Sequence, residues 1–173
     1  YQLNLSGLFT QSAFFDYDND GDLDAYIMGH SLYPNAYFGR GSQRTKTDST
    51  NGDKLLENRD GVFIDASAKA NIFSSRIGYG LGLAISDINN DGYPDIYIGN
   101  DFFEDDYLYI NQTDGSFKEI NTTEGKLGHT SHFSMGNDIA DVNNDGFTDI
   151  LSVDMLPENL ETLKSSGTEF NFP

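Results

Sequence analysis

The sequence contains no cysteine, which excludes disulfide bonds and metal sites built on thiolates. No run of apolar residues approaches the roughly 18 that a membrane-spanning helix requires, so we expect no transmembrane segment in this chain. The N-terminus has neither an initiator methionine nor the basic and apolar regions of a signal peptide. We therefore expect a mature chain or a fragment, while the lack of cysteine leaves its compartment open.

Basic residues are scarce: 10 lysines and arginines stand against 28 aspartates and glutamates, which gives a formal net charge of -18. Nucleic-acid binding requires clustered basic side chains, so this balance excludes a nucleic-acid partner from our expectations. Repulsion among so many carboxylates opposes a compact fold unless a cation neutralises part of the charge. Proline is also rare, with four residues, whereas 18 glycines indicate many tight turns between short strands.

An acidic pattern, D-x-[DN]-x-D-G-x-x-D, occurs three times, at residues 16–24, 87–95 and 141–149. Calcium takes about six to eight oxygen ligands, and side chains at positions 1, 3 and 5 of such a loop can converge on one ion. Position 6 is always glycine, which suits a sharp turn. Position 7 can supply its backbone carbonyl, and position 9 returns a carboxylate that closes the shell. We therefore predict three calcium sites.

The expected metal ligands occupy positions 1, 3, 5, 7 and 9 of the three loops. They are Asp16, Asp18, Asp20, Asp22, Asp24, Asp87, Asn89, Asp91, Tyr93, Asp95, Asp141, Asn143, Asp145, Phe147 and Asp149.

Two alternatives compete with this interpretation. Metal-free turns would account for Asn-Asp-Gly, but not for acids at positions 1, 5 and 9 of every copy. An EF-hand needs a glutamate at position 12 and helices on both sides, whereas position 12 here is Ile27, Ile98 or Ser152. Short β-branched and aromatic segments flank each loop instead, which predicts strands. Each unit is thus expected to be a β-hairpin with the ion at its turn.

The spacing of the strand patterns predicts an all-β protein built from β-propeller blades, each a four-stranded antiparallel sheet with its calcium loop between the first two strands. We expect residues 1–11 to end a preceding blade or lead into the first one. One blade should span 12–72, with an inserted surface loop at 39–53, and a second 78–125. An incomplete blade and a polar tail should occupy 133–173. About two and a half blades indicate a partial propeller, since closed ones have about four to eight.

These segments resemble the FG-GAP/VCBS repeat family, which includes integrin-α-like and cartilage-acidic-protein-like propellers and exported bacterial proteins. The resemblance is carried by GLGLAISD…DIYIGND at residues 80–101, YINQTDGSF at 109–117 and FSMGNDIAD…DI at 133–150. It covers residues 12 to 156 and is greatest to exported bacterial members. It implies a seven-bladed propeller with calcium in the first hairpin of the blades, and a fold used mainly as a scaffold.

Other motifs carry less chemistry. The glycine-rich stretch at 78–82 lacks the last glycine and the helix of a dinucleotide loop. His129 and His132 are expected in a loop rather than on one helix face, and no serine nucleophile motif is present. We therefore expect no enzymatic activity. Segments 39–53 and 100–106 are candidate surfaces, with a solvated loop the simpler interpretation of each.

The leading hypothesis is a calcium-stabilised, non-catalytic binding scaffold that is extracellular or on the cell surface, in the bacterial envelope, with a protein or glycan ligand. One alternative is the propeller of a larger secreted enzyme, which an additional catalytic domain would favour. Another is an accessory subunit of an outer-membrane complex, which co-purification with membrane proteins would favour.

Overall fold

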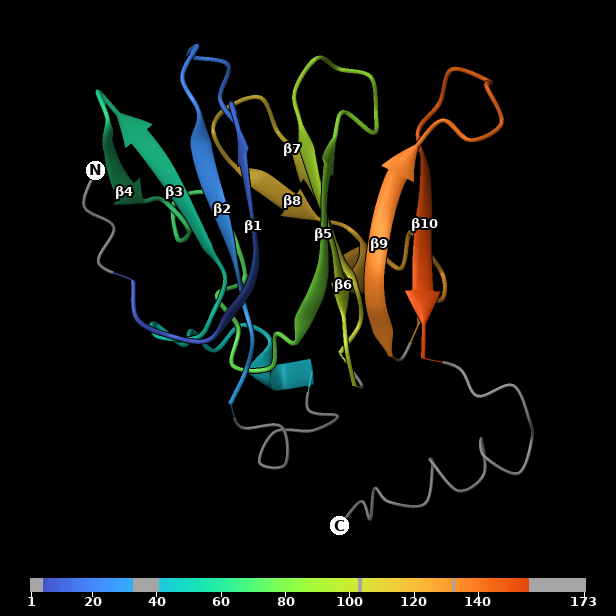
Figure 1. Cartoon of the computed structure of the whole chain (residues 1–173), viewed down its shortest axis with the longest axis horizontal. Coiled ribbons are helices and arrows are strands. Elements are labelled where there is room, and N and C mark those ends of the chain that lie inside the picture. The colour runs from blue at the N-terminus through green and yellow to red at the C-terminus, as the bar shows by residue number, and fades with distance from the viewer. Residues whose placement is uncertain (1–4, 33–40, 103, 132, 156–173) are drawn as a thin grey trace.

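The computed structural model describes residues 5–32, 41–102, 104–131 and 133–155, which form three antiparallel sheets standing side by side (Figure 1). The first sheet has the order β1 (Phe9–Phe15), β2 (Asp24–Gly29), β3 (Lys54–Arg59) and β4 (Val62–Asp65). The second has the order β5 (Gly80–Ser86), β6 (Asp95–Asn100), β7 (Tyr107–Asn111) and β8 (Phe117–Glu119). The third pairs β9 (Ser134–Ala140) with β10 (Asp149–Asp154).

The expected all-β class is confirmed, with two four-stranded antiparallel sheets, and the described residues do not form a closed propeller. Helical structure in the described ranges is limited to a 3-10 turn at Gly41–Gln43 and α2 (Asn121–Glu124). No helix in this part of the chain is long and apolar enough to cross a membrane. The expected polar tail from residue 156 onward lies outside the described residues.

The first strand of the first sheet begins earlier than its sequence pattern indicates. β1 begins at Phe9, three residues before the expected start of the first blade, and Gln11 already pairs with Met28. A register shift between Phe9 and Gln11 interrupts the alternation of inward and outward side chains. A similar shift lies between Gly80 and Gly82. These irregularities interrupt the side-chain alternation at the beginning of β1 and of β5, so periodicity alone does not locate those strand starts.

An apolar core fills the junction between the first and second sheets. Tyr26, Met28 and Leu55 of the first sheet meet Ile96 and Ile98 of the second, and all five are fully buried. The aromatic rings of β7 and β8 belong to the same cluster. This junction therefore buries a continuous apolar cluster, which stabilises the stacking of the two sheets.

The junction between the second and third sheets is built differently. A Cβ atom on Gly82 would lie 2.6 Å from Asn137 Nδ2, and one on Gly99 would lie 2.6 Å from Ser134 Oγ. Glycines here let the two backbones approach closely. The amide atoms of Asn137 are buried without a hydrogen-bond partner among the described residues. The side chains at this second junction are consequently smaller and more polar than those at the first.

Residues 39–53 were expected to form an inserted surface loop. The last residue of this segment, Asp53, directly precedes β3. Asp53 is 3% exposed, and its carboxylate accepts hydrogen bonds from Tyr26 Oη at 2.8 Å and from the Gly29 amide at 2.7 Å. Burial raises the pKa of Asp53 to about 6, against these two stabilising bonds. Residues 42–50 are exposed or half-buried, as expected of a surface loop, whereas the polar residues Asn51 and Asp53 at its end are buried and form internal hydrogen bonds.

The same arrangement recurs in the second sheet. Asp106, which is fully buried, accepts hydrogen bonds from Tyr97 Oη at 2.5 Å and from the Asn100 amide at 2.8 Å. Burial likewise raises the pKa of Asp106 to about 6. Segment 100–106 was expected to be solvated, so this expectation is also wrong at both of its ends.

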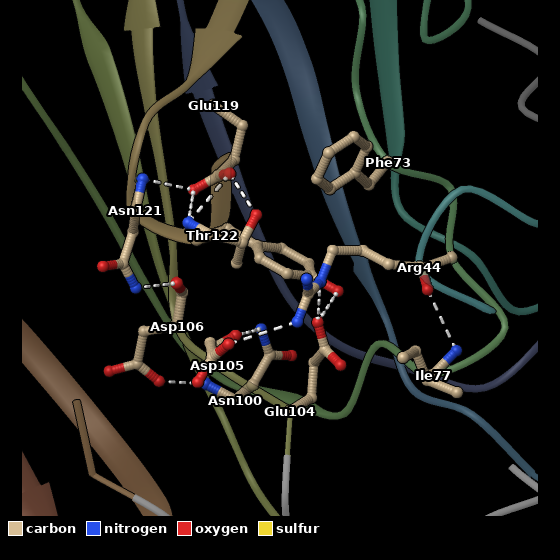
Figure 2. A network of polar contacts seen from close by, with 12 residues as sticks. Arg44, Phe73, Ile77, Asn100, Glu104, Asp105, Asp106, Glu119, Asn121 and Thr122 are labelled. Carbon is tan, nitrogen blue, oxygen red and sulfur yellow. Dashed lines mark hydrogen bonds and ion pairs between the residues drawn. The ribbon is translucent and has the colours of Figure 1, made fainter. Parts of the chain in front are cut away.

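Arg44 joins the two connections across the sheet junction (Figure 2). Its guanidinium pairs with Glu104 and lies 3.2 Å from a carboxylate oxygen of Asp105. Tyr107 Oη donates to the same Glu104 carboxylate at 2.9 Å. The Glu104 side chain is only 3% exposed, and burial raises its pKa to about 7 despite the arginine. The ion pair therefore fastens the connection of the first sheet to that of the second.

Replacing Arg44 by glutamine should leave Glu104 buried without a cation, and we expect a loss of about 1–3 kcal/mol in the free energy of unfolding. Arg59→Gln is the matched control, because Arg59 pairs with Glu57 at 2.7 Å but is 55% exposed, and an exposed pair contributes only about 0–1 kcal/mol. Urea unfolding of both variants measures the difference. Equal losses would contradict a fastening role for Arg44.

Candidate metal centre

The three acidic loops share one backbone conformation and project from the same end of the sheets (Figure 1). Residues with positive φ occupy loop positions 4 and 6: Asn19 (59°), Gly21 (96°), Asn90 (59°), Gly92 (88°), Asn144 (62°) and Gly146 (86°). Glycine adopts this region freely, and asparagine is the non-glycine residue that tolerates it best. Position 4, which the ligand pattern leaves variable, is therefore asparagine for a conformational reason.

Position 1 organises the turn in every copy. The Asp16 carboxylate accepts the backbone N–H groups of Asp20 at 3.1 Å and Gly21 at 3.0 Å. Asp87 and Asp141 accept the equivalent pairs of N–H groups. The carboxylate at position 5 accepts the N–H of position 7 in each loop. Two predicted ligands per loop are thus held against their own backbone before any ion binds.

The carboxylate at position 9 ties the loop to the sheet. Asp24 accepts the Tyr17 amide at 3.0 Å on one oxygen and the Asn58 amide, at the end of β3, at 2.8 Å on the other. Asp95 accepts the Asn111 amide, at the end of β7, in the same way at 2.8 Å. The Asp149 carboxylate accepts a hydrogen bond from within its own hairpin, from the Val142 amide at 3.1 Å. Position 9 therefore has a structural role besides its predicted role as a ligand.

Two asparagines missed by the ligand pattern complete this link. Asn58 Nδ2 donates to the Leu23 carbonyl at 3.1 Å, and Asn111 Nδ2 donates to the Pro94 carbonyl at 3.3 Å. Asn111 Nδ2 also donates to the Tyr17 carbonyl at 2.8 Å, which connects the second sheet to the first loop. The available signal was an asparagine ending the third strand just before a glycine turn in both sheets.

The first loop brings three acidic side chains together. Asp16, Asp18 and Asp24 each place a carboxylate oxygen within 4.8 Å of the others, and the first loop alone does so among the described residues. One oxygen of Asp18 is buried without a hydrogen-bond partner, as is one of Asp22. Three carboxylates this close together, one of which has an unpartnered buried oxygen, fit the oxygen-rich shell of a hard divalent cation.

The electrostatics of the loops differ. Burial raises the pKa of Asp24 to about 6, with the charge of Asp18 adding to the shift. The pKa of Asp18 is raised by burial and then by Asp20. In the exposed third loop, the Gly146 amide lowers the pKa of Asp141. In the first loop burial, followed by the charge of acidic neighbours, thus disfavours ionised carboxylates, and a cation would offset both effects.

The residue at position 3 of each loop explains why the first loop differs electrostatically from the other two. Asn89 accepts the Asp91 amide at 3.0 Å and donates to the Asp91 carboxylate at 2.9 Å, so the second loop is internally satisfied. Asn143 also accepts the amide of position 5, at 2.9 Å. The first loop carries Asp18 at this position, which can only accept hydrogen bonds when ionised. No contact of the position 7 carbonyls is described, so their role as ligands stays a prediction.

The remaining candidates lie elsewhere. The glycine-rich stretch at 78–82 runs into β5 rather than into a helix, which agrees with its rejection as a dinucleotide loop. His129 lines a cavity between the second and third sheets, while His132 lies outside the described residues.

Exchanging the residue at position 3 tests this interpretation in the absence of metal. Asp18→Asn removes repulsion and should raise the melting temperature by roughly 1–4 °C, the equivalent of about 0.5–1 kcal/mol. The reciprocal Asn89→Asp places a carboxylate against Asp91 and should lower it by a similar amount. Melts in chelator measure both shifts. Two shifts of the same sign would contradict the role of position 3.

Comparison with known proteins supports the resemblance. Residues 87–152 match the FG-GAP-like repeat, a span that runs from the second acidic loop to β10. This match confirms the expected repeat family over those residues. No curated protein shows significant similarity to the chain.

Proposed function

Because residues 87–152 carry an FG-GAP-like repeat, we propose that the protein is a calcium-stabilised, non-catalytic binding scaffold that forms part of a propeller and works outside the cytoplasm. The observation that carries the proposal is the group formed by Asp16, Asp18 and Asp24, in which one Asp18 oxygen lacks a partner. Such a group is stable at neutral pH when a cation replaces the missing hydrogen bonds.

Calcium suits this group better than other common metals. The donors are carboxylate oxygens, whereas structural zinc sites use cysteine or histidine. Magnesium requires near-ideal octahedral geometry and keeps several waters, while calcium accepts irregular oxygen shells. Asp16, Asp18 and Asp24 would hold the ion, with Asp20 and the carbonyl of Asp22 completing the shell. Asp87, Asp91 and Asp95, and Asp141, Asp145 and Asp149, are the equivalent acidic ligands of the second and third sites.

Bound calcium would act on the fold rather than on a substrate. In the first loop it would offset the burial and the neighbouring charges that raise the pKa of Asp24, whose carboxylate also accepts the Asn58 amide near the end of β3. The ion would thereby hold the turn, the hairpin and the third strand together. Carboxylates that already serve backbone N–H groups of their own loop are suited to this structural role.

The loop ends offer a recognition surface. Leu23, Val142 and Phe147 are 56%, 74% and 66% exposed, and they lie in loops that project from the same end of the sheets. Loops on a rigid scaffold are common sites of recognition. We propose a protein or glycan ligand for this face, on the cell surface or in the bacterial envelope.

Location outside the cytoplasm follows from calcium supply. Extracellular calcium modules bind with dissociation constants of about 10⁻⁴–10⁻³ M, a concentration range that the cytoplasm does not reach. Empty loops would leave the first cluster with uncompensated charge. Fractionation of the native source should place the full-length protein in the envelope or medium, and recovery in the cytoplasm alone would refute this location.

Calcium should raise the melting temperature relative to chelator. At a calcium concentration 100-fold above the dissociation constant, linkage provides about 2.7 kcal/mol for one site, or roughly 5–11 °C. Asp18→Asn should reduce the calcium-dependent shift, because it removes a charged ligand of the first site. Asp114→Asn, in an exposed turn remote from the loops in sequence, is the control and should preserve the shift. Identical melts with calcium and with chelator would sink the proposal.

A further inference from the structure

One buried side chain joins the first acidic loop to the second sheet. Asn111, the last residue of β7, is 2% exposed and donates through Nδ2 to the Tyr17 carbonyl at 2.8 Å. The same Nδ2 donates to the Pro94 carbonyl at 3.3 Å, while Oδ1 accepts the Thr113 N–H at 2.9 Å. Both polar atoms of this amide therefore have partners, which fixes the direction in which Nδ2 points.

Both carbonyls belong to peptide groups that carry predicted ligands. The Tyr17 carbonyl is bonded to the nitrogen of Asp18, at position 3 of the first loop. The Pro94 carbonyl is bonded to the nitrogen of Asp95, at position 9 of the second loop. Because a peptide group is planar, a bond that fixes the carbonyl also fixes the nitrogen that follows it. The Asn111 amide thus orients the backbone at one ligand of each loop.

Asn111 also contacts a ligand of the second loop directly. Its backbone N–H donates to Asp95 Oδ1 at 2.8 Å, and Asp95 Oδ2 accepts the Ile88 N–H at 2.8 Å. In the first loop, the Tyr17 N–H donates to Asp24 Oδ2 at 3.0 Å. A path of hydrogen bonds therefore runs from the position 9 carboxylate of the first loop to that of the second, through Tyr17 and Asn111.

Packing and a second hydrogen bond support this connection. The buried Tyr17 ring stacks on the Phe117 ring of β8, with centroids 6.1 Å apart and planes at 26°. At the exposed ends of the loops, Asn19 Nδ2 donates to the Gly92 carbonyl at 3.1 Å, from position 4 of the first loop to position 6 of the second. The first loop is therefore held at a buried point and at an exposed one.

The corresponding asparagine of the first sheet provides a contrast. Asn58 Nδ2 donates to the Leu23 carbonyl, and its N–H donates to Asp24, so both bonds stay within one sheet and its loop. The hydrogen bonds described for the third loop join residues 141–149 to one another. In the described part of the chain, a hydrogen bond between two loops is found only from the first to the second.

We propose that the first and second loops bind calcium as a coupled pair, with Asn111 as the positioning residue and Asn19 as a second link. This inference rests on the calcium binding proposed above. Occupancy of the first loop would hold Asp24 and the Tyr17 peptide groups, and through them the Asn111 amide and Asp95. Binding at the second loop then loses less conformational freedom, so its affinity is higher. The effect is reciprocal by linkage.

Charge works against this coupling. Two divalent ions in neighbouring loops repel each other, and each cancels negative charge that attracts the other. Replacing Asn111 or Asn19 by an uncharged residue leaves this repulsion unchanged. A comparison of such variants therefore isolates the contribution of the hydrogen bonds, and one neutral bond corresponds to about 3- to 10-fold in affinity.

A tryptophan at position 7 of the second loop would report its occupancy, because the chain has no tryptophan and position 7 is predicted to bind through its carbonyl. In Tyr93→Trp, the emission gives the calcium concentration at half-saturation. Asp18→Ala, which removes a ligand of the first loop, should raise that concentration by about 3- to 10-fold. With Asn111→Ala also present, Asp18→Ala should change it by less than about 2-fold. Asn58→Ala is the matched control and should preserve the full effect.

Asn19→Gly tests the exposed link. Glycine removes the amide without straining the backbone, which has a φ of 59° at this position. The variant should reduce the effect of Asp18→Ala, and it decides the matter if Asn111→Ala does not fold. Circular dichroism melts in chelator establish which variants are folded.

The outcomes separate this inference from the calcium binding on which it rests. Emission and melts that are both insensitive to calcium refute the two together. A calcium response of the second loop that Asp18→Ala leaves unchanged or strengthens overturns the coupling alone. An effect of Asp18→Ala that persists in full in the folded variants of Asn111 and Asn19 overturns the role of these asparagines.

Discussion

The carboxylate at position 9 of the acidic loops is the interaction on which the rest of the structure depends. In the first two sheets one aspartate accepts an amide from its own loop and another from the end of the third strand. It thereby continues the pairing of the second and third strands to the loop end of the sheet. Asp24 is buried, and this burial raises its pKa by disfavouring the ionised carboxylate. A calcium ion at the same carboxylate would reconcile burial with ionisation.

A second carboxylate acts at the opposite end of the sheet. Asp53 and Asp106 hold the beginning of the third strand to the tyrosine of the second, with the same two donors in each sheet. Both ends of the central strand pair are thus fastened by buried aspartate. Much of the strongly acidic composition therefore serves internal hydrogen bonding, and only part of it belongs to the candidate metal loops.

The two sheet junctions distribute stability unevenly. The first is aromatic and apolar, and Arg44 reinforces it through Glu104. The second contains glycines, serines and the unpartnered amide of Asn137. Hydrophobic burial is the main stabilising contribution in such stacks, so among the described residues the first junction contributes more to stability than the second.

The sequence by itself determined the loops, the strands that flank them and the all-β class, because glycine turns and alternating side chains depend on neighbours within a few residues. It also located the acids that the first loop gathers. Only the tertiary structure decided that Asp53 is buried, that Arg44 meets Glu104 across 60 residues and that Asn58 anchors a loop. Such contacts follow from the pairing of distant strands and the approach of two sheets, and a polar residue there has the same local pattern as one in a solvated loop.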